Sequence, residues 1–238
     1  MASGGAVECL RVADLHAFYG ESHILHGMDF RVWRGEVVTL LGRNGAGRTT
    51  TIKAIVGLVE KRSGSIMLNG REVVEWAPHR IARLGVGYCP EERGIFSSLS
   101  AEENLRLPPK LTSEGLSDEE IYELFPNLKE QRRVPGTVLS GGEQQMLAMA
   151  RILRAGARLL LLDEISEGLA PVIVKRLSEV ILQLREKGFT IVMAEQNLHF
   201  AAALADRMYV VERGRVVVEI AKDEVEGSRQ LLRELLGV

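Results

Sequence analysis

A glycine-rich segment over residues 42–49 has the composition of a loop that binds phosphate. Its sequence, GRNGAGRT, follows an apolar run and opens a helical pattern, which is the context that a phosphate-binding loop requires. Glycines let the backbone bend tightly and turn its N–H groups toward an anion, and the positive end of the following helix dipole adds to the attraction. The alternative is a glycine turn that only caps a helix. We expect nucleotide contacts from Gly42, Arg43, Asn44, Gly45, Ala46, Gly47, Arg48, Thr49 and Thr50, with the Thr49 hydroxyl also offered to Mg²⁺.

Arg48 departs from the usual pattern of such loops, which place lysine before the hydroxyl residue. Arginine keeps the positive charge, but its planar fork is not interchangeable with the compact ammonium of lysine in a tight site. The side chain that faces the phosphates therefore has the usual charge without the usual shape.

Two adjacent acids end the apolar run LLLLDE over residues 159–164. Ligands of α/β sheets bind beyond the carboxyl ends of the strands, so we expect neighbouring strands to place Asp163 close to Thr49. Asp163 would hold Mg²⁺, directly or through water, and Glu164 would reach a water that attacks a γ-phosphate. Phosphoryl transfer needs positioning and charge neutralisation above all. The alternative is a pair of acids that caps a helix after a core strand.

The elements that would position these residues are short apolar runs followed by helical patterns. The runs cover residues 37–42, 159–163 and 189–194, and they show little polar alternation. That pattern is typical of parallel strands covered on both faces. Helical patterns follow the runs at residues 49–57, 171–187 and 198–206. This alternation predicts an α/β fold with a mostly parallel sheet and helices on both faces.

Two further segments differ from this core. Residues 8–34 and 64–74 indicate short strands and turns, including the turn signal Asn69-Gly70. Residues between 91 and 137 are charged and interrupted by prolines, with a short helix expected over 119–125. We expect one domain over 1–238, with the core and a small antiparallel β subdomain at about 1–90 and 156–238 and an inserted helical subdomain at about 91–155. Residues 224–236 predict an amphipathic C-terminal helix.

Composition narrows the class of protein. The net charge of −2 and the pI of about 6.3 give no bulk positive field, so we expect no nucleic-acid partner. Cys9 and Cys89 lack metal-ligand spacing and are expected to be reduced thiols. No apolar run approaches a membrane span, and the start MASGGAVECL has no signal-peptide pattern. We expect a cytoplasmic protein whose membrane role comes through a partner.

A third motif, LSGGEQQ over residues 139–145, places a serine and two glycines before a helical stretch. Its N–H groups and hydroxyl would form a second anion site in the same chain. LSGGEQQ between the glycine loop and LLLLDE resembles the signature of ABC-type ATPases. The resemblance implies that two subunits sandwich two ATP molecules, in a homodimer or in a heterodimer with a related ABC ATPase. Nucleotide contacts from the signature are then expected from Ser140, Gly141, Gly142 and Glu143, supplied to the site of the other subunit.

The resemblance covers nearly the whole chain and assigns further residues. Tyr19 matches the aromatic residue that stacks on adenine, or it packs within its strand. Glu91 stands where most ABC ATPases have a glutamine that senses the γ-phosphate, or it is a solvated acid. Gln196 stands at the place of the switch histidine, with a catalytic role expected beside Glu164 and Arg48, or it caps the following helix. The segment SEGLAP over residues 166–171 lies where the family has its dimer-contact loop.

The variants PEERGIF, AEQN and SEGLAP resemble the ATP-binding subunits of branched-chain amino acid importers and their urea or amide relatives. This implies a permease partner, an indirect external solute-binding protein and a peripheral position on the inner face of the cell membrane. Ile95, Phe96 and Leu99 are expected to form a groove for the permease, or they only pack the helical subdomain. A soluble ABC ATPase of translation or DNA repair is a further alternative, although such proteins usually carry two cassettes, long coiled coils or basic arms.

Two residues depart from the family pattern. Arg48 replaces its lysine, and Ile165 replaces the proline that follows the two acids. We expect ATP binding to survive, because the backbone N–H groups, Tyr19 and Mg²⁺ remain, and hydrolysis to slow. A degenerate subunit that binds ATP, hydrolyses it weakly and supports a partner's site is therefore the alternative to an active transport ATPase.

Overall fold

A six-stranded central sheet forms the frame of the computed structural model, which describes residues 7–237. The strand order is β10-β9-β3-β8-β7-β6. All neighbours are parallel except β10, which pairs antiparallel with β9. The mostly parallel sheet confirms the predicted fold class. The strands are β3 Val37–Leu41, β6 Val86–Cys89, β7 Leu159–Asp163, β8 Thr190–Glu195, β9 Arg207–Glu212 and β10 Arg215–Ala221.

The three predicted apolar runs became β3, β7 and β8, and every residue of these strands is buried. The side chains of β7 alternate between two cores. Leu159 and Leu161 pack with the antiparallel sheet and the first helix, whereas Leu160 and Leu162 pack with the helices of the opposite face. Both faces of the sheet are therefore covered, which explains why the runs lack polar alternation.

An antiparallel sheet of four strands packs beside the core, in the order β2-β1-β4-β5. Its strands are β1 Glu8–Tyr19, β2 Ser22–Trp33, β4 Lys61–Leu68 and β5 Arg71–Glu72. The predicted turn joins β4 to β5, and both of its residues have positive φ angles, 48° at Asn69 and 77° at Gly70. Asparagine and glycine tolerate this left-handed conformation best.

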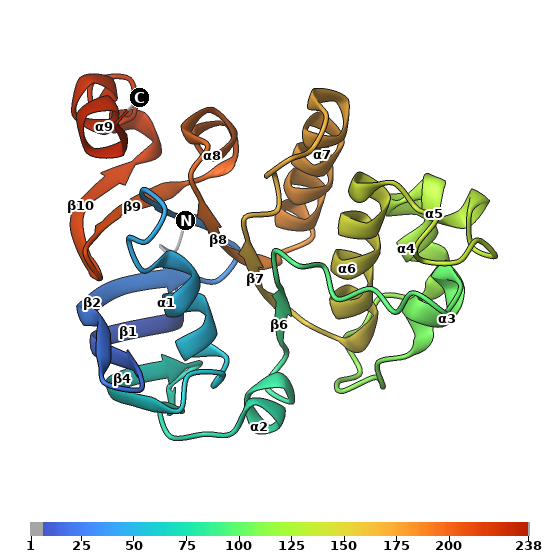
Figure 1. Ribbon diagram of the computed structural model, residues 1–238, viewed down its shortest axis with the longest axis horizontal. Coiled ribbons are helices and arrows are strands. Elements are labelled where there is room, and N and C mark those ends of the chain that lie inside the picture. The colour runs from blue at the N-terminus through green and yellow to red at the C-terminus, as the bar shows by residue number, and fades with distance from the viewer. Residues whose placement is uncertain (1–6, 238) are drawn as a thin grey trace, which may run out of the picture.

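The helices lie around the two sheets, and Figure 1 shows α3 to α6 grouped together on one side of the central sheet. These four helices follow β6 and precede β7 in the chain; the boundaries at 91 and 155 stay a prediction. The bounds are α1 Arg48–Ile55, α2 Pro78–Ala82, α3 Ala101–Arg106, α4 Asp118–Leu124, α5 Pro126–Glu130, α6 Gly141–Ala155, α7 Pro171–Glu186, α8 Leu198–Leu204 and α9 Arg229–Leu236.

The C-terminal helix is shorter than predicted. It begins at Arg229, after a 3₁₀ turn over Lys222–Glu224. Residues 225–228 separate the two, and Gly227 and Ser228 among them are poorer helix formers than the residues that follow. The prediction of a helix over 224–236 was wrong for its first turn.

The N-terminal segment without a signal-peptide pattern includes residues 1–6, which lie outside the described residues. Across residues 7–237, every helix falls short of the length and apolarity that a membrane crossing demands. Cys9 and Cys89 are free and buried.

Candidate active site

The glycine-rich loop connects β3 to α1 and is shaped by close approaches. Gly45 and Gly47 have φ angles of 80° and 109°, where residues with a side chain are strained. A Cβ atom at Gly42 would lie 2.5 Å from the carbonyl oxygen of Val211, so the loop could not approach β9 with a larger residue. Gly47 precedes α1 without a side-chain cap, which leaves the first N–H groups of the helix to other acceptors. The loop thus caps a helix and also offers the donors that an anion requires.

Thr49 and Asp163 meet beyond the carboxyl ends of two strands. The Thr49 hydroxyl donates to Asp163 Oδ1 at 2.9 Å, and the Tyr88 hydroxyl donates to Asp163 Oδ2 at 3.2 Å. The proximity was expected, but its stated cause was wrong, because β8 lies between β3 and β7. The contact instead comes from the loop and the first residues of α1. Burial raises the pKa of Asp163, and the hydrogen bonds from Thr49 and Tyr88 oppose this rise.

Arg48 is buried and reaches the second acid. Its Nη2 atom donates to Glu164 Oε1 at 2.8 Å and to Asn44 Oδ1 at 3.1 Å. The Arg48 side chain is 3% exposed and that of Glu164 is 12% exposed. The Nη1 atom of Arg48 is buried and has no hydrogen-bond partner among the described residues. A phosphate oxygen in the loop would supply the acceptor that this nitrogen lacks.

Glu164 continues the pairing of β7 and then turns. Its N–H donates to the Ala194 carbonyl at 2.9 Å, and its φ angle is 48°, which is strained for a residue with a side chain. Burial raises the pKa of Glu164 to about 7, a hydrogen bond with Glu167 adds to the rise, and the Arg48 charge opposes it. The helix that follows, α7, begins at Pro171. Asp163 and Glu164 therefore cap no helix, and that alternative was wrong.

Three residues assigned by resemblance lie at exposed positions. Glu91 approaches Glu164, and its carboxylate, that of Glu164 and that of Glu167 have oxygens within 4.8 Å of one another. Gln196 follows β8 and is exposed, but Asn197 caps α8 by accepting from Phe200 N–H at 3.0 Å. The alternative that Gln196 caps this helix was therefore wrong. Tyr19 ends β1 and is 48% exposed.

The LSGGEQQ segment opens α6 through a capping box. Ser140 Oγ accepts from Glu143 N–H at 3.4 Å, and Glu143 Oε2 accepts from Ser140 N–H at 2.8 Å. A Cβ atom at Gly142 would lie 2.5 Å from Ile173 Cγ2 on α7, so glycine allows the two helices to pack. Gly141 lies against the Arg93 guanidinium. Among residues 7–237, no hydrogen bond or ion pair joins Ser140 or Glu143 to the glycine-rich loop.

One buried acid near the site was given no role from the sequence. Glu195, at the end of β8, is 2% exposed and accepts from the Ser166 hydroxyl at 2.8 Å and the Ser166 N–H at 3.3 Å. Burial raises the pKa of Glu195 to about 7, and these hydrogen bonds oppose the rise. The only sequence signal for this contact is an acid at the end of an apolar strand, which is too common to identify a site.

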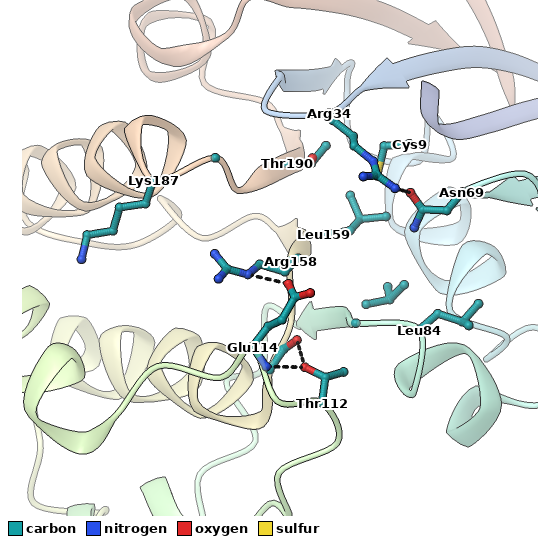
Figure 2. A pocket seen from close by; sticks show the side chains of 14 residues that line it. Cys9, Arg34, Asn69, Leu84, Thr112, Glu114, Arg158, Leu159, Lys187 and Thr190 are labelled. Atoms are coloured by element: carbon teal, nitrogen blue, oxygen red, sulfur yellow. Dashed lines mark hydrogen bonds and ion pairs between the residues drawn. The ribbon is translucent and has the colours of Figure 1, made fainter. Parts of the chain in front are cut away.

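A cavity of about 440 Å³ lies at the opposite edge of the sheet (Figure 2), where β6, β7 and β8 begin. Two of its charged side chains already form hydrogen bonds with other residues that line the cavity. Arg34 Nη2 donates to Asn69 at 3.0 Å, and Arg158 Nε donates to Glu114 at 2.9 Å. The cavity therefore belongs to the amino ends of the strands, and the chemistry described above belongs to their carboxyl ends.

Comparison with known proteins shows which family this chain resembles. A family model described as ABC transporter matches residues 25–167, more than half of the chain. The high-affinity branched-chain amino acid transport ATP-binding protein BraG of Pseudomonas aeruginosa is 43% identical over 204 residues, covering 84% of this chain and 88% of that protein. The probable branched-chain amino acid transport ATP-binding protein LivF of Archaeoglobus fulgidus is 34% identical over 233 residues, covering 96% and 99%.

An export-system protein and a solved structure are also similar to this chain. The lipopolysaccharide export system ATP-binding protein LptB of Escherichia coli K12 is 32% identical over 234 residues, covering 96% of this chain and 97% of that protein. A solved ATP-binding subunit of an ABC transporter superposes with a TM-score of 0.78 at 31% identity, covering 97% and 95%. From its loop, acids and signature, and from these matches, the chain belongs to the ABC transporter family of ATPases.

Proposed function

We propose that this chain is the ATP-hydrolysing motor subunit of an importer for branched-chain amino acids or related small polar solutes. The observation that carries the proposal is the contact of Thr49 with Asp163 at 2.9 Å, with Glu164 as the next residue. Similarity to BraG at 43% identity and to LivF at 34% supports the solute class. LptB, at 32% identity, offers weaker support for an export role.

The loop residues would bind the phosphates of ATP. Backbone N–H groups from Gly42 to Thr50 would donate to phosphate oxygens, and so would Arg48 Nη1, which has no acceptor within the described part of the chain. Hydroxyl and carboxylate oxygens are the ligands that Mg²⁺ prefers, so Thr49 and Asp163 fit this ion. Mg²⁺ would supply charge neutralisation at the phosphates when bound.

Glu164 would accept a proton from the attacking water. Its position beside the loop fits this role, since Arg48 contacts both Glu164 and Asn44. Glu91 and Gln196 would lie near the γ-phosphate, and Tyr19 would stack on adenine. These roles follow from the family resemblance and from the placement of the side chains around the loop.

The signature would act on the ATP of a second subunit. Within residues 7–237, Ser140 makes no hydrogen bond to the loop of its own chain, which agrees with a site completed by a dimer partner. The partner is a second copy or a related ABC ATPase. The pair would dock on permease subunits at the inner face of the membrane, with a solute-binding protein acting from outside.

A second candidate is a subunit that binds ATP and hydrolyses it weakly. The ion pair of Arg48 with Glu164, at 2.8 Å, favours this candidate because it occupies the carboxylate that should activate water. Measured turnover separates the two candidates, since both predict ATP binding.

The test is ATP-driven uptake by the chain reconstituted with its permease and solute-binding protein in liposomes. Leucine uptake that depends on ATP, and that fails with Glu164→Gln, is the expected result. Uptake of urea or an amide in place of leucine would change the solute class. Tight ATP binding with no turnover above the Glu164→Gln level would select the weakly hydrolysing subunit, and no ATP binding would overturn both candidates.

A further inference from the structure

Two histidines on the antiparallel sheet bring their ring nitrogens together, far along the chain from the acids of the active site. His16 lies on β1 and His23 on β2, and Nδ1 of His16 shares a hydrogen bond with Nε2 of His23 at 3.0 Å, which an ion bound between the two nitrogens would replace. The ring of His23 stacks on Phe18 with centroids 4.1 Å apart, and it contacts the ring of His26 at 4.0 Å. Rings on both sides therefore restrict the orientation of His23.

A carboxylate holds the other nitrogen of His16. Asp14 Oδ1 lies 3.1 Å from His16 Nε2. The backbone is shaped for this contact, because Asp14 has a φ angle of 45° at an irregularity in the pairing of β1 with β2. Opposite it, a Cβ atom at Gly27 would lie 2.9 Å from Asp14 Oδ1, so glycine leaves room for the carboxylate.

This arrangement has the features of a metal site. A carboxylate that accepts from one ring nitrogen of a histidine leaves the lone pair of the other nitrogen for a ligand, and metal-binding histidines commonly have such a partner. Two nitrogens bound at about 2.0–2.1 Å to one ion, at angles of 90–110°, lie roughly 2.9–3.4 Å apart. The observed 3.0 Å falls in this range.

The site is also accessible. The side chain of His16 is 29% exposed and that of Asp14 is 80% exposed, so an ion can enter from solvent.

We propose that His16 and His23 form a binding site for a divalent transition-metal ion, with Asp14 as the residue that orients His16. Imidazole ligands select ions such as Zn²⁺, Ni²⁺ and Cu²⁺ over Mg²⁺. Water completes the coordination, and the ion links β1 to β2 beside Tyr19. The proposal stands independently of the transport function.

The test is calorimetric titration of the full chain with ZnCl₂, in a buffer with excess Mg²⁺ to saturate the Thr49 and Asp163 position. One Zn²⁺ per chain is expected. His16→Ala or His23→Ala should weaken binding at least tenfold, and Asp14→Asn roughly tenfold, as for other residues that orient a metal ligand. His79 and His199 are exposed elsewhere on the chain, and alanine at either position should leave the affinity unchanged.

Thermal unfolding gives a second measurement that also controls for folding. Zn²⁺ should raise the Tm of the parent chain and of His79→Ala, and EDTA should reverse the rise, because binding to the folded state stabilises it. His23→Ala should keep its metal-free Tm near that of the parent and lose the response. Zinc binding that is absent, or that survives in both His16→Ala and His23→Ala, would overturn the proposal. Loss of binding in Glu167→Gln instead would move the metal to the acidic group beside Glu164.

Discussion

Replacing Arg48 with lysine changes the residue that contacts both the loop and the proposed base. In the structure Arg48 Nη2 donates to both Glu164 at 2.8 Å and Asn44 at 3.1 Å, and Nη1 is buried and finds no acceptor in residues 7–237. Lysine has a single nitrogen, so it cannot hold Glu164 and still contact the phosphates as a fork does. We expect Arg48→Lys to free Glu164 and to raise ATP hydrolysis.

Two estimates give the size of this effect. A hydrogen bond to a charged partner contributes about 1.5–3 kcal/mol, so releasing Glu164 from Arg48 corresponds to roughly 10–150-fold in rate. One donor aimed correctly at developing charge contributes about 10²–10³ in kcat, or roughly 3–4 kcal/mol. The two effects overlap, because the same side chain causes both. We expect an increase of about 10²–10³ in kcat, with ATP affinity changing by less than about tenfold.

The assay is steady-state phosphate release with the permease present, for the parent chain and for Arg48→Lys. ATP affinity is measured separately in a Glu164→Gln background, where turnover is blocked. Arg229→Lys, an exposed change of the same type on α9, is the matched control and should leave the rate unaltered. Agreement of the parent and Arg48→Lys rates within a factor of two would refute the reasoning.

Three further predictions follow from exposure and burial. Tyr19→Ala should weaken ATP binding about 5–150-fold in a fluorescent-nucleotide titration, because base stacking contributes about 1–3 kcal/mol. The control Tyr19→Phe keeps the ring and should bind ATP as the parent does. An unchanged affinity of Tyr19→Ala would remove Tyr19 from the site. Phe96 is 49% exposed, so Phe96→Glu should reduce co-purification with the permease and leave ATP binding unchanged. The control Val217→Glu, at a residue 46% exposed on β10, should leave both co-purification and ATP binding unchanged. Normal co-purification of Phe96→Glu would discard the groove. The raised pKa of Glu195, about 7 against an ordinary 4.5, makes the folded state bind more protons between these values, so stability falls as pH rises through this window. Glu195→Gln should match the parent Tm at pH 5 and exceed it by several degrees at pH 8, which corresponds to about 3 kcal/mol in the free energy of unfolding. Equal Tm shifts at both pH values would contradict the assignment.

Much of the core could be predicted from local patterns. Strands buried on both faces need apolar side chains at consecutive positions, and β7 meets this requirement with four leucines. The rule that ligands bind at the carboxyl ends of strands predicted that Thr49 and Asp163 lie close together, and the 2.9 Å hydrogen bond confirms it. Strands β6, β9 and β10 were not identified. β6 has only four residues and β10 is half-exposed, which gives each a weak pattern, whereas β9 is mostly buried but is bounded by charged residues.

Long-range contacts could not be predicted in the same way. No local pattern states that β8 separates β3 from β7, because strand order depends on the packing of crossover helices. The contact of Arg48 with Glu164 joins residues 116 positions apart, and it depends on the left-handed backbone of Glu164. The roles of Glu91 and Gln196 stay predictions, since both side chains are exposed at the edge of the site.

The packing of Gly142 against Ile173 ties the start of α6 to the start of α7, which lie side by side in Figure 1. The space between Gly142 and Ile173 is too small for one added methyl group. A displacement of α7 would therefore also displace the first turn of α6, which Ser140 caps. Glu164 and Ser166 lie on the segment that leads into α7, so a movement of this segment would also displace the start of the LSGGEQQ helix. A residue larger than glycine at position 142 would force these two helices apart.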